Sequence, residues 1–460
     1  MRHYKNEFGH WFRALGIASA CMFLPVSQAF ALPVIPGAVG YGIDTPAGRG
    51  GSVYRVTNLN ASGSGSLKAC LDASGPRVCV FEVSGTIRLT SDIQINNPNL
   101  TVAGQTAPSP GITIRGAGLK VSANDVLIQH IRMRVGDDRD GSTPSQRAGF
   151  KIMHGSRTVN NVVLDHVSVS WTIDQLLSVW DGARNVTVNN SVFAEPLDDS
   201  LHPSAPHGFG PLVAGQSNTR MSMIGNVIST SRARNPRTAI ATFLFANNVV
   251  YNWKTRGTEI FNRNGVPSKT SLIGNVYKPG PESGSTKGIV IEPNRGNASL
   301  AMHSNSRVYV SDNRGAGYNA SNPWSMVDNY AGNWVRATSS PVSLAGFEPM
   351  DSSKVEAHVL ANAGARPTDR DSVDKRIMSQ VANGTGRMID SPRDVGGWPS
   401  TPVNRRVLAL PSNPNADSNG NGYTNLEEWL HAFAAEMEGV KAEDPKQPAR
   451  PKAPANLTAD

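Results

Sequence analysis

A loose repeat runs through the middle of the chain and constrains its fold more than any other feature. Each copy has a short run of β-forming residues, a polar kink that is usually occupied by Asn or His, and in most copies a second β-run. The copies follow one another at intervals of roughly 22 to 36 residues, which lies within the range of solenoid coils. They begin at Asn99, Asp125, Asn161, Asn185, Arg220, Phe243, Ser271 and Arg307.

The repeat predicts an all-β fold, a right-handed parallel β-helix. One coil cannot bury its own apolar face, and stacking against neighbouring coils completes the core. The alternative is a β-sandwich, which favours shorter and more even spacing of strands. Asn190, Asn226, Asn248 and Asn275 fall at matching kinks, so we expect a ladder of hydrogen-bonded amides rather than four unrelated turns.

The first 31 residues predict a secretory signal peptide. Basic residues near the start precede an apolar run from Ala14 to Val26, and the small-x-small sequence Ala29-Phe30-Ala31 follows. The alternative, a membrane anchor, requires a longer apolar run. We therefore expect cleavage after Ala31, secretion to the extracellular space or the periplasm, and no membrane span.

The cysteines support the same compartment. Cys21 leaves with the signal peptide, so the mature chain keeps Cys70 and Cys79. An even number of cysteines in an oxidising compartment predicts one disulfide between them. Two buried free thiols are the alternative.

The pattern changes beyond about residue 345. Helical periodicity predicts helices over Ser352–Ala363 and Ser372–Val381, with Asp351 and Asp371 as N-caps. The last residues are rich in Lys, Pro and Ala and predict a disordered tail. The expected division is a β-helix domain at 32–345, a wrapping extension at 346–410, a calcium loop and helix at 411–438, and the tail at 439–460.

The stretch from Asp417 to Glu428 matches the calcium loop of an EF-hand. Oxygen-bearing side chains stand at the ligand positions, a glycine stands at the sharp turn and a glutamate closes the loop. We expect a structural Ca²⁺; a plain polar turn before a helix at Leu426–Met437 is the alternative. The expected ligands are Asp417, Asn419, Asn421, the backbone carbonyl of Tyr423, and Glu428.

Three arginines, Arg232, Arg234 and Arg237, lie within six residues of one another. Such guanidinium groups repel one another unless an anion lies between them, and their planar forks fit carboxylates. The cluster therefore predicts a site for an acidic ligand, and a solvated basic turn is the alternative. The formal charge of +8 also favours a polyanionic partner, whereas the absence of a nucleic-acid motif argues against nucleic acid.

Coil stacking predicts what surrounds these arginines. Residues one coil apart in the sequence come to lie side by side in a solenoid. Asp174 and Glu195 are therefore expected to line one groove with the arginines. His202 and His207, next to Pro and Gly in a loop, are expected at this surface site, whereas His166 at an inward kink is expected to be a core residue.

Several motifs resemble the polysaccharide lyases of the pectate lyase type (family one), especially their secreted bacterial and fungal branch. The resemblance extends from about Pro36 to Pro399, and the order of the motifs makes it specific. It implies a right-handed β-helix, in agreement with the repeat, and we expect a monomer. The motifs are Gly50-Gly-Ser-Val-Tyr-Arg-Val-Thr-Asn-Leu-Asn, Gly75-Pro-Arg, Val83-Ser-Gly-Thr-Ile, Asn99-Leu-Thr-Val-Ala-Gly-Gln-Thr-Ala-Pro, Asp165-His-Val-Ser-Val-Ser-Trp, Arg234-Asn-Pro-Arg, Asn247-Asn-Val-Val-Tyr-Asn-Trp and Gly396-Gly-Trp-Pro.

The resemblance also implies a reaction, the cleavage of pectate (polygalacturonate) or a related polyuronate by calcium-assisted β-elimination. Arg234 matches the family's base in its Arg-x-Pro context, and Arg232 and Arg237 would bind substrate carboxylates. Asp174 matches one ligand of the catalytic Ca²⁺. Ser178 stands where a second carboxylate is expected.

Two further departures affect the substrate and the metal. The segment Gln146-Arg147-Ala148 lacks the carboxylate expected on the preceding coil, and the loop from His202 to His207 lacks the family's substrate-binding lysine. The resemblance therefore implies that Ca²⁺ arrives with the substrate or that the substrate differs from plain pectate. Two other functions remain open: a hydrolase using the acid pair Asp198-Asp199, and a polysaccharide-binding β-helix without lyase activity.

Overall fold

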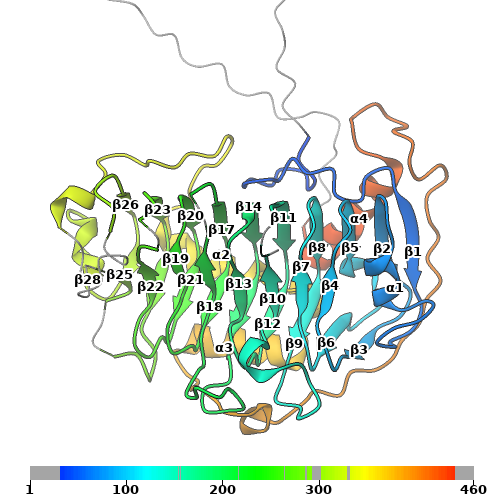
Figure 1. Cartoon of the computed structure of the whole chain (residues 1–460), viewed down its shortest axis with the longest axis horizontal. Coiled ribbons are helices and arrows are strands. Elements are labelled where there is room, and N and C mark those ends of the chain that lie inside the picture. The colour runs from blue at the N-terminus through cyan, green and yellow to red at the C-terminus, as the bar shows by residue number, and fades with distance from the viewer. Residues whose placement is uncertain are drawn as a thin grey trace, which may run out of the picture. The chain divides into compact units, whose positions relative to one another are not determined.

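The computed structural model describes residues 32–440 apart from residues 154, 156, 216, 264, 285–286, 293–301 and 329–331 (Figure 1). The predicted signal peptide at 1–31 lies outside the described residues, as does the predicted tail beyond Val440. From Pro33 onward the described residues belong to one compact unit. No helix in this part of the chain has the length and apolar character needed to cross a bilayer.

This unit is a right-handed parallel β-helix with three sheets, and neighbouring strands within each sheet are parallel (Figure 1). The first sheet contains β1 (Ser52–Val56), β2 (Arg77–Phe81), β5 (Leu100–Ala103), β8 (Val126–Gln129), β11 (Val159–Asp165), β14 (Ala183–Asn189), β17 (Arg220–Ile224), β20 (Thr242–Ala246), β23 (Lys269–Ile273) and β26 (Arg307–Ser311). The second contains β3 (Gly85–Arg88), β6 (Ile112–Arg115), β9 (Ile131–Arg134), β12 (Ser168–Ser170), β15 (Val192–Ala194), β18 (Val227–Ser229), β21 (Val249–Tyr251), β24 (Val276–Lys278) and β27 (Arg314–Gly315). The third contains β4 (Ile93–Ile95), β7 (Leu119–Val121), β10 (Phe150–Ile152), β13 (Leu177–Val179), β16 (Leu212–Ala214), β19 (Arg237–Ala239), β22 (Thr258–Ile260), β25 (Ile289–Ile291) and β28 (Val327–Asp328).

The polar kinks of the repeat are the corners between the first and second sheets. His130, His166, Asn190, Asn247 and Asp312 each turn the chain with a φ between 48° and 55°. Asn, Asp and His enter this left-handed region more readily than other side chains do. The need for a left-handed residue at these corners therefore explains the polar kink in the repeat.

The predicted asparagine ladder is present, but with one different member. The Oδ1 atoms of Asn248, Asn275 and Asn313 each accept the backbone amide of the asparagine on the preceding coil, at 2.9, 3.0 and 3.0 Å. Asn226 begins the run, and its Oδ1 accepts the amide of Ser191 at 2.9 Å. The inclusion of Asn190 was wrong, because Asn190 occupies the left-handed corner one residue before the ladder position.

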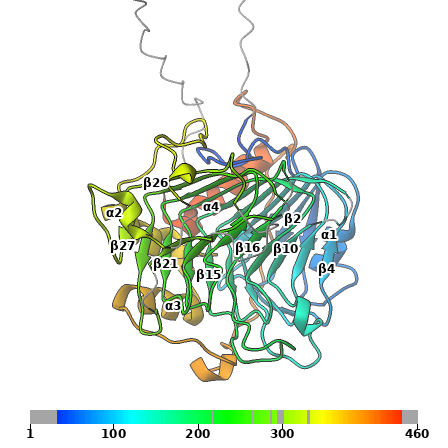
Figure 2. The same ribbon diagram turned by 60° about the vertical axis from the view of Figure 1, so that its left-hand side comes forward.

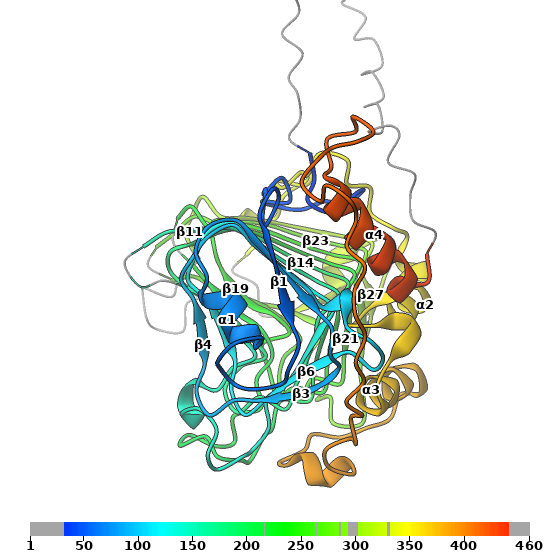
Figure 3. The same ribbon diagram turned by 90° about the vertical axis from the view of Figure 1, so that its right-hand side faces the viewer.

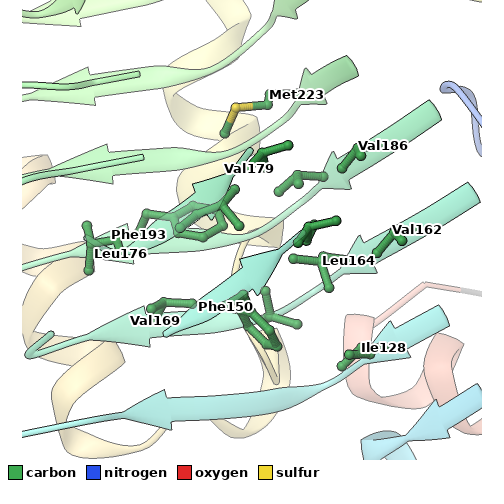
Figure 4. Close-up of a cluster of buried hydrophobic side chains, with 14 of the residues drawn as sticks. Ile128, Phe150, Val162, Leu164, Val169, Leu176, Val179, Val186, Phe193 and Met223 are labelled. Atoms are coloured by element: carbon green, nitrogen blue, oxygen red, sulfur yellow. The ribbon is translucent and has the colours of Figure 1, made fainter. Parts of the chain in front are cut away.

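The core lies inside the three sheets. Figure 4 shows inward side chains from all three, among them Val162 on β11, Phe193 on β15 and Phe150 on β10, which are completely buried. Burying a side chain of this size contributes about 1.5–3 kcal/mol. Stacked coils thus share one continuous apolar interior, as the repeat predicts.

Helices cover two outer surfaces of the coils (Figures 2 and 3). The predicted helices are confirmed as α2 (Ser352–Asn362) and α3 (Ser372–Asn383), and both predicted caps accept an amide in the first turn. Both helices pack on the outer face of the second sheet. The final helix, α4 (Asn425–Glu438), packs on the outer face of the first sheet near its β1 end.

Buried ion pairs fix α3 to the β-helix. Arg134 Nη2 donates to Asp374 Oδ1 at 2.6 Å and to Asp371 Oδ1 at 3.2 Å. The side chains of Arg134 and Asp374 are fully buried. The two nearby arginines Arg134 and Arg132 lower the pKa of Asp371 to about 2, against the opposing effect of burial.

A short helix that the sequence did not predict, α1 (Leu67–Asp72), lies at the β1 end of the coils (Figure 3). Ser66 caps it by accepting the amide of Ala69. The disulfide predicted between Cys70 and Cys79 is present and joins α1 to β2.

Candidate active site

Three turns on successive coils form the candidate active site. They connect the second sheet to the third and lie between β12 and β13, between β15 and β16, and between β18 and β19. Parallel bridges join Gln175 to Phe209 and Phe209 to Ala233, so the three turns lie side by side. Coil stacking therefore brings the predicted aspartate, histidines and arginines together.

Arg234 is the central cation of this site. Its backbone is left-handed, with a φ of 67°, and its amide donates to Glu259 Oε1 at 3.1 Å. The guanidinium carbon lies 4.0 Å from the centre of the Phe209 ring. Within the described part of the chain this guanidinium has no ion pair, and its buried Nη1 has no hydrogen-bond partner.

The surroundings of Arg234 make it an unusually acidic arginine. Burial and the neighbouring charge of Arg237 lower the pKa of Arg234 to about 10, although Asp174 and Glu259 act in the opposite direction. Arginine is ordinarily protonated at any pH that a protein tolerates. This site therefore reduces the free energy needed to deprotonate the guanidinium.

Arg232 and Arg237 differ from Arg234 because the chain itself supplies their counterions. Arg232 donates from Nε and Nη2 to the two oxygens of Asp198, at 2.8 and 2.6 Å. Arg237 Nη2 donates to Glu292 Oε2 at 3.2 Å, and its Nε lies 3.7 Å from Glu259 Oε2. The repulsion that the sequence predicts among the three guanidinium groups is thus relieved by internal carboxylates at the two flanking positions.

His202, His207 and Asp174 form a compact cluster beside Arg234. The imidazole rings are stacked, with centroids 3.5 Å apart, and His207 Nε2 lies 3.2 Å from Asp174 Oδ1. Nδ1 of His202 accepts the amide of Ser204 at 3.0 Å. Burial, His207 and Arg234 lower the pKa of His202 below its usual value, against the opposing charge of Asp174, which favours the neutral ring.

These residues do not fit a resident calcium ion. Ca²⁺ takes six to eight oxygen ligands, whereas the cluster offers the carboxylate of Asp174 and the nitrogens of two imidazoles. The Ser178 hydroxyl donates to Gln175 Oε1 at 2.8 Å. On the preceding coil Arg147 is buried and accepts the Asp174 amide with its carbonyl oxygen. Because Ser178 and Arg147 stand where carboxylates were expected, Asp174 is the carboxylate that this cluster offers to a metal.

One predicted member of the groove lies elsewhere. Glu195 is buried, and its Oε2 accepts from Arg376 Nη2 at 2.8 Å and from Trp171 Nε1 at 3.2 Å. Arg376 belongs to α3, so Glu195 helps to attach that helix rather than to line the site. The expectation that Glu195 lines the groove was wrong, because the left-handed turn at Glu195 directs it toward α3.

Known proteins resemble the chain over most of its length. It is 33% identical over 428 residues to the probable pectate lyase C of Neosartorya fischeri, covering 88% of this chain and 95% of that protein. It is 32% identical over 439 residues to the probable pectate lyase C of Aspergillus terreus, covering 91% and 98% of the two chains. This chain belongs to the pectate lyase family.

The similarity to solved structures is lower in sequence. The pectate lyase fold superimposes on the crystal structure of Jun a 1, the major allergen from cedar pollen, with a TM-score of 0.49 and 15% identity over 70% of this chain and 91% of that one. No family model matches the sequence.

Sequence reasoning missed several residues that shape this pectate lyase-type site. Phe209 supplies the aromatic face under Arg234, and Glu259 holds its backbone. Glu259 could have been found from the strand register of the repeat, because it pairs directly with Arg237 on the neighbouring strand. Asp198 was considered only as a hydrolytic acid, yet it is the counterion of Arg232.

The EF-hand-like loop is a separate candidate metal site. The Asp417 oxygens accept the amides of Gly420 and Gly422, at 2.8 and 2.8 Å. Glu428 Oε1 accepts from Asn419 Nδ2 at 2.6 Å and from Asn421 Nδ2 at 2.7 Å. Three of the predicted side-chain ligands, Asn419, Asn421 and Glu428, thus converge, and turning over the two asparagine side-chain amides would present oxygens to a cation instead of nitrogens. This donor set fits Ca²⁺.

Proposed function

We propose that the chain is a secreted polysaccharide lyase that cleaves pectate or a related polyuronate by β-elimination, with Arg234 as the base. The observation that carries this proposal is the environment of Arg234, whose guanidinium forms no ion pair among the described residues and whose pKa is lowered to about 10. A general base is most effective when its pKa is near the operating pH. The lowered pKa brings this arginine closer to that range.

The reaction would proceed at the uronate ring. Arg234, once neutral, takes the proton from C5, next to the carboxylate carbon. The C5–H electron pair forms the C4=C5 double bond, and the C4–O bond to the next sugar breaks. The departing oxygen takes a proton from water or from a protein group. The products are a chain with a new hydroxyl end and an unsaturated uronide.

The remaining residues would bind the substrate. Arg232 and Arg237 flank the base, and their cationic forks can orient uronate carboxylates beside it. His202 and His207 would contact the sugar hydroxyls through their ring nitrogens. Ca²⁺, when bound with Asp174 and the substrate's own carboxylates, would supply charge neutralisation; because protein ligands are few, we expect it to arrive with the substrate.

The test uses polygalacturonate and related polyuronates, with and without Ca²⁺ or a chelator. A lyase produces ultraviolet absorbance from the new double bond together with new chain ends. New reducing ends without that absorbance would establish a hydrolase and contradict the proposal. The structure gives little support to the hydrolase, because both oxygens of Asp198 are engaged by Arg232.

A matched pair of variants separates a lyase from a binding protein. Arg234→Ala should abolish turnover and retain polyuronate binding, measured by affinity electrophoresis. Arg157→Ala, which removes an exposed arginine between β10 and β11, is the control. Inactivity of the wild-type protein on every polyuronate, with binding intact, would favour the non-enzymatic β-helix.

The proposed organisation and compartment have direct tests as well. N-terminal sequencing of the exported protein should begin at Leu32, and sedimentation should give a monomer. The proposed division places catalysis in residues 32–345, the wrapping extension at 346–410, and the structural Ca²⁺ at 411–438. Ca²⁺ should raise the melting temperature of the wild-type protein but not of Glu428→Gln.

A further inference from the structure

A second cluster of titratable side chains lies under α4, outside the candidate active site. His130 and His166 occupy equivalent corners after β8 and β11, and their rings are stacked with centroids 5.1 Å apart and an interplanar angle of 7°. Asp165 ends β11, and Glu438 is the last residue of α4. The side chains of His130, Asp165 and His166 are 0, 4 and 5% exposed, so the cluster is closed to solvent on the side of the coils.

The hydrogen bonding of His130 leaves one nitrogen lone pair inside this cluster. Its Nδ1 lies 2.8 Å from the carbonyl oxygen of Ala365. A carbonyl only accepts, so Nδ1 carries the proton and Nε2 of the neutral ring is a bare acceptor. Nε2 is buried without a hydrogen-bond partner among the described residues, and Glu438 Oε1 lies 3.3 Å from it. Two acceptor atoms this close are stable together when a proton or a metal cation lies between them.

The other distances identify the kind of cation. His166 Nδ1 lies 2.9 Å from Asp165 Oδ2 and 3.4 Å from Glu438 Oε1. One ligand atom from each of the four residues lies within 4.8 Å of the others. Tetrahedral Zn²⁺ with bonds of about 2.0–2.1 Å separates its ligand atoms by roughly 3.3 Å. The observed separations are close to this edge length.

We propose that His130 Nε2, His166 Nδ1, Asp165 and Glu438 form a binding site for a divalent transition metal, with Zn²⁺ as the best match. Two imidazole nitrogens and two carboxylates suit zinc, whereas Ca²⁺ and Mg²⁺ prefer oxygen ligands alone. Gln129 Nε2 donates to Asp165 Oδ2 at 3.1 Å and supports the carboxylate from the neighbouring coil. The metal would fasten the end of α4 to two coils of the β-helix.

The test is titration calorimetry of the metal-free mature protein with Zn²⁺ at pH 7.5. We expect one stoichiometric binding event and a rise in melting temperature. Glu438→Gln and His130→Gln, which preserve side-chain size, should each weaken this binding by about 100-fold or more. Co²⁺ in the same site should give the visible absorption bands of tetrahedral coordination, which do not depend on enzymatic activity.

Two controls make the result specific. Glu436→Gln changes an exposed carboxylate on the same helix and should leave Zn²⁺ binding unchanged. His202→Gln changes the histidine cluster of the candidate active site and should also leave this event unchanged. The proposal is overturned if the wild-type protein binds no Zn²⁺, or if stoichiometric binding survives both Glu438→Gln and His130→Gln.

Discussion

At the residue scale, the three arginines have different roles although they are close in sequence. They lie on one turn, but their side chains contact different residues of the folded chain. Asp198 neutralises Arg232, and Glu259 and Glu292 neutralise Arg237, while Arg234 lies against an aromatic ring. The proposed base, Arg234, therefore differs from its two neighbours in having no ion pair among the described residues, which sequence alone cannot show.

The first prediction concerns the pH dependence of Arg234. Since its pKa is about 10, only a small fraction of Arg234 is neutral at pH 7. This neutral fraction increases tenfold for each unit by which the pH rises toward the pKa. We expect kcat on polygalacturonate to rise with pH and to level off near pH 10. Arg234→Lys should lower kcat by about 10²–10⁴. A profile that is flat between pH 7 and pH 10 would contradict the role of base.

The second prediction concerns the pair formed by Arg232 and Asp198. Arg232 is half-buried, and removing it leaves the nearly buried Asp198 carboxylate without its counterion, so Arg232→Met should destabilise the protein by about 1–3 kcal/mol. Asp198 is only 6% exposed. The double variant Arg232→Met, Asp198→Asn should recover much of this loss in denaturant unfolding. Equal stability of the single and double variants would show that the pair is not coupled.

At the element scale, the coil corners explain how much the sequence could predict. Left-handed residues at most of these corners create a visible repeat, so the parallel β-helix could be predicted from the sequence, whereas the third strand of each coil could not. The ladder position was harder to predict. The ladder residue directly follows the corner residue, and asparagine is favoured at both positions. Counterion pairs such as Arg232 with Asp198 could not be predicted, since they depend on the path of the turn between β15 and β16.

The third prediction separates these two asparagine positions. Asn248→Ala leaves backbone and side-chain partners on adjacent coils unsatisfied, which costs about 1–3 kcal/mol for each buried group. Asn190→Gly should be close to neutral, because glycine already occupies the matching corners at Gly225 and Gly274. Thermal unfolding of the two variants measures the contrast. Equal losses would mean that the corner and the ladder are not distinct.

On the scale of the whole β-helix unit, the β1 end is protected by α1 and its disulfide. The bond closes a short loop between α1 and β2, where both cysteines are buried. In the chain-entropy relation a loop of this length corresponds to about 2–3 kcal/mol. An exposed terminal coil would otherwise be the first to open.

The fourth prediction follows from that position. Replacing both cysteines by serine should lower the free energy of unfolding by about 2–3 kcal/mol. Hydrogen exchange should accelerate first in β1 and β2, and later in coils near β14. Uniform acceleration along the solenoid would contradict a local role for the disulfide.

The placement of the candidate active site on turns has a consequence for how such a chain can diversify. The coils fix where each turn begins and ends, and between β15 and β16 none of residues 199–207 is buried. Insertions and replacements between β15 and β16 can therefore change the ligand at the site while the stacking of the sheets persists.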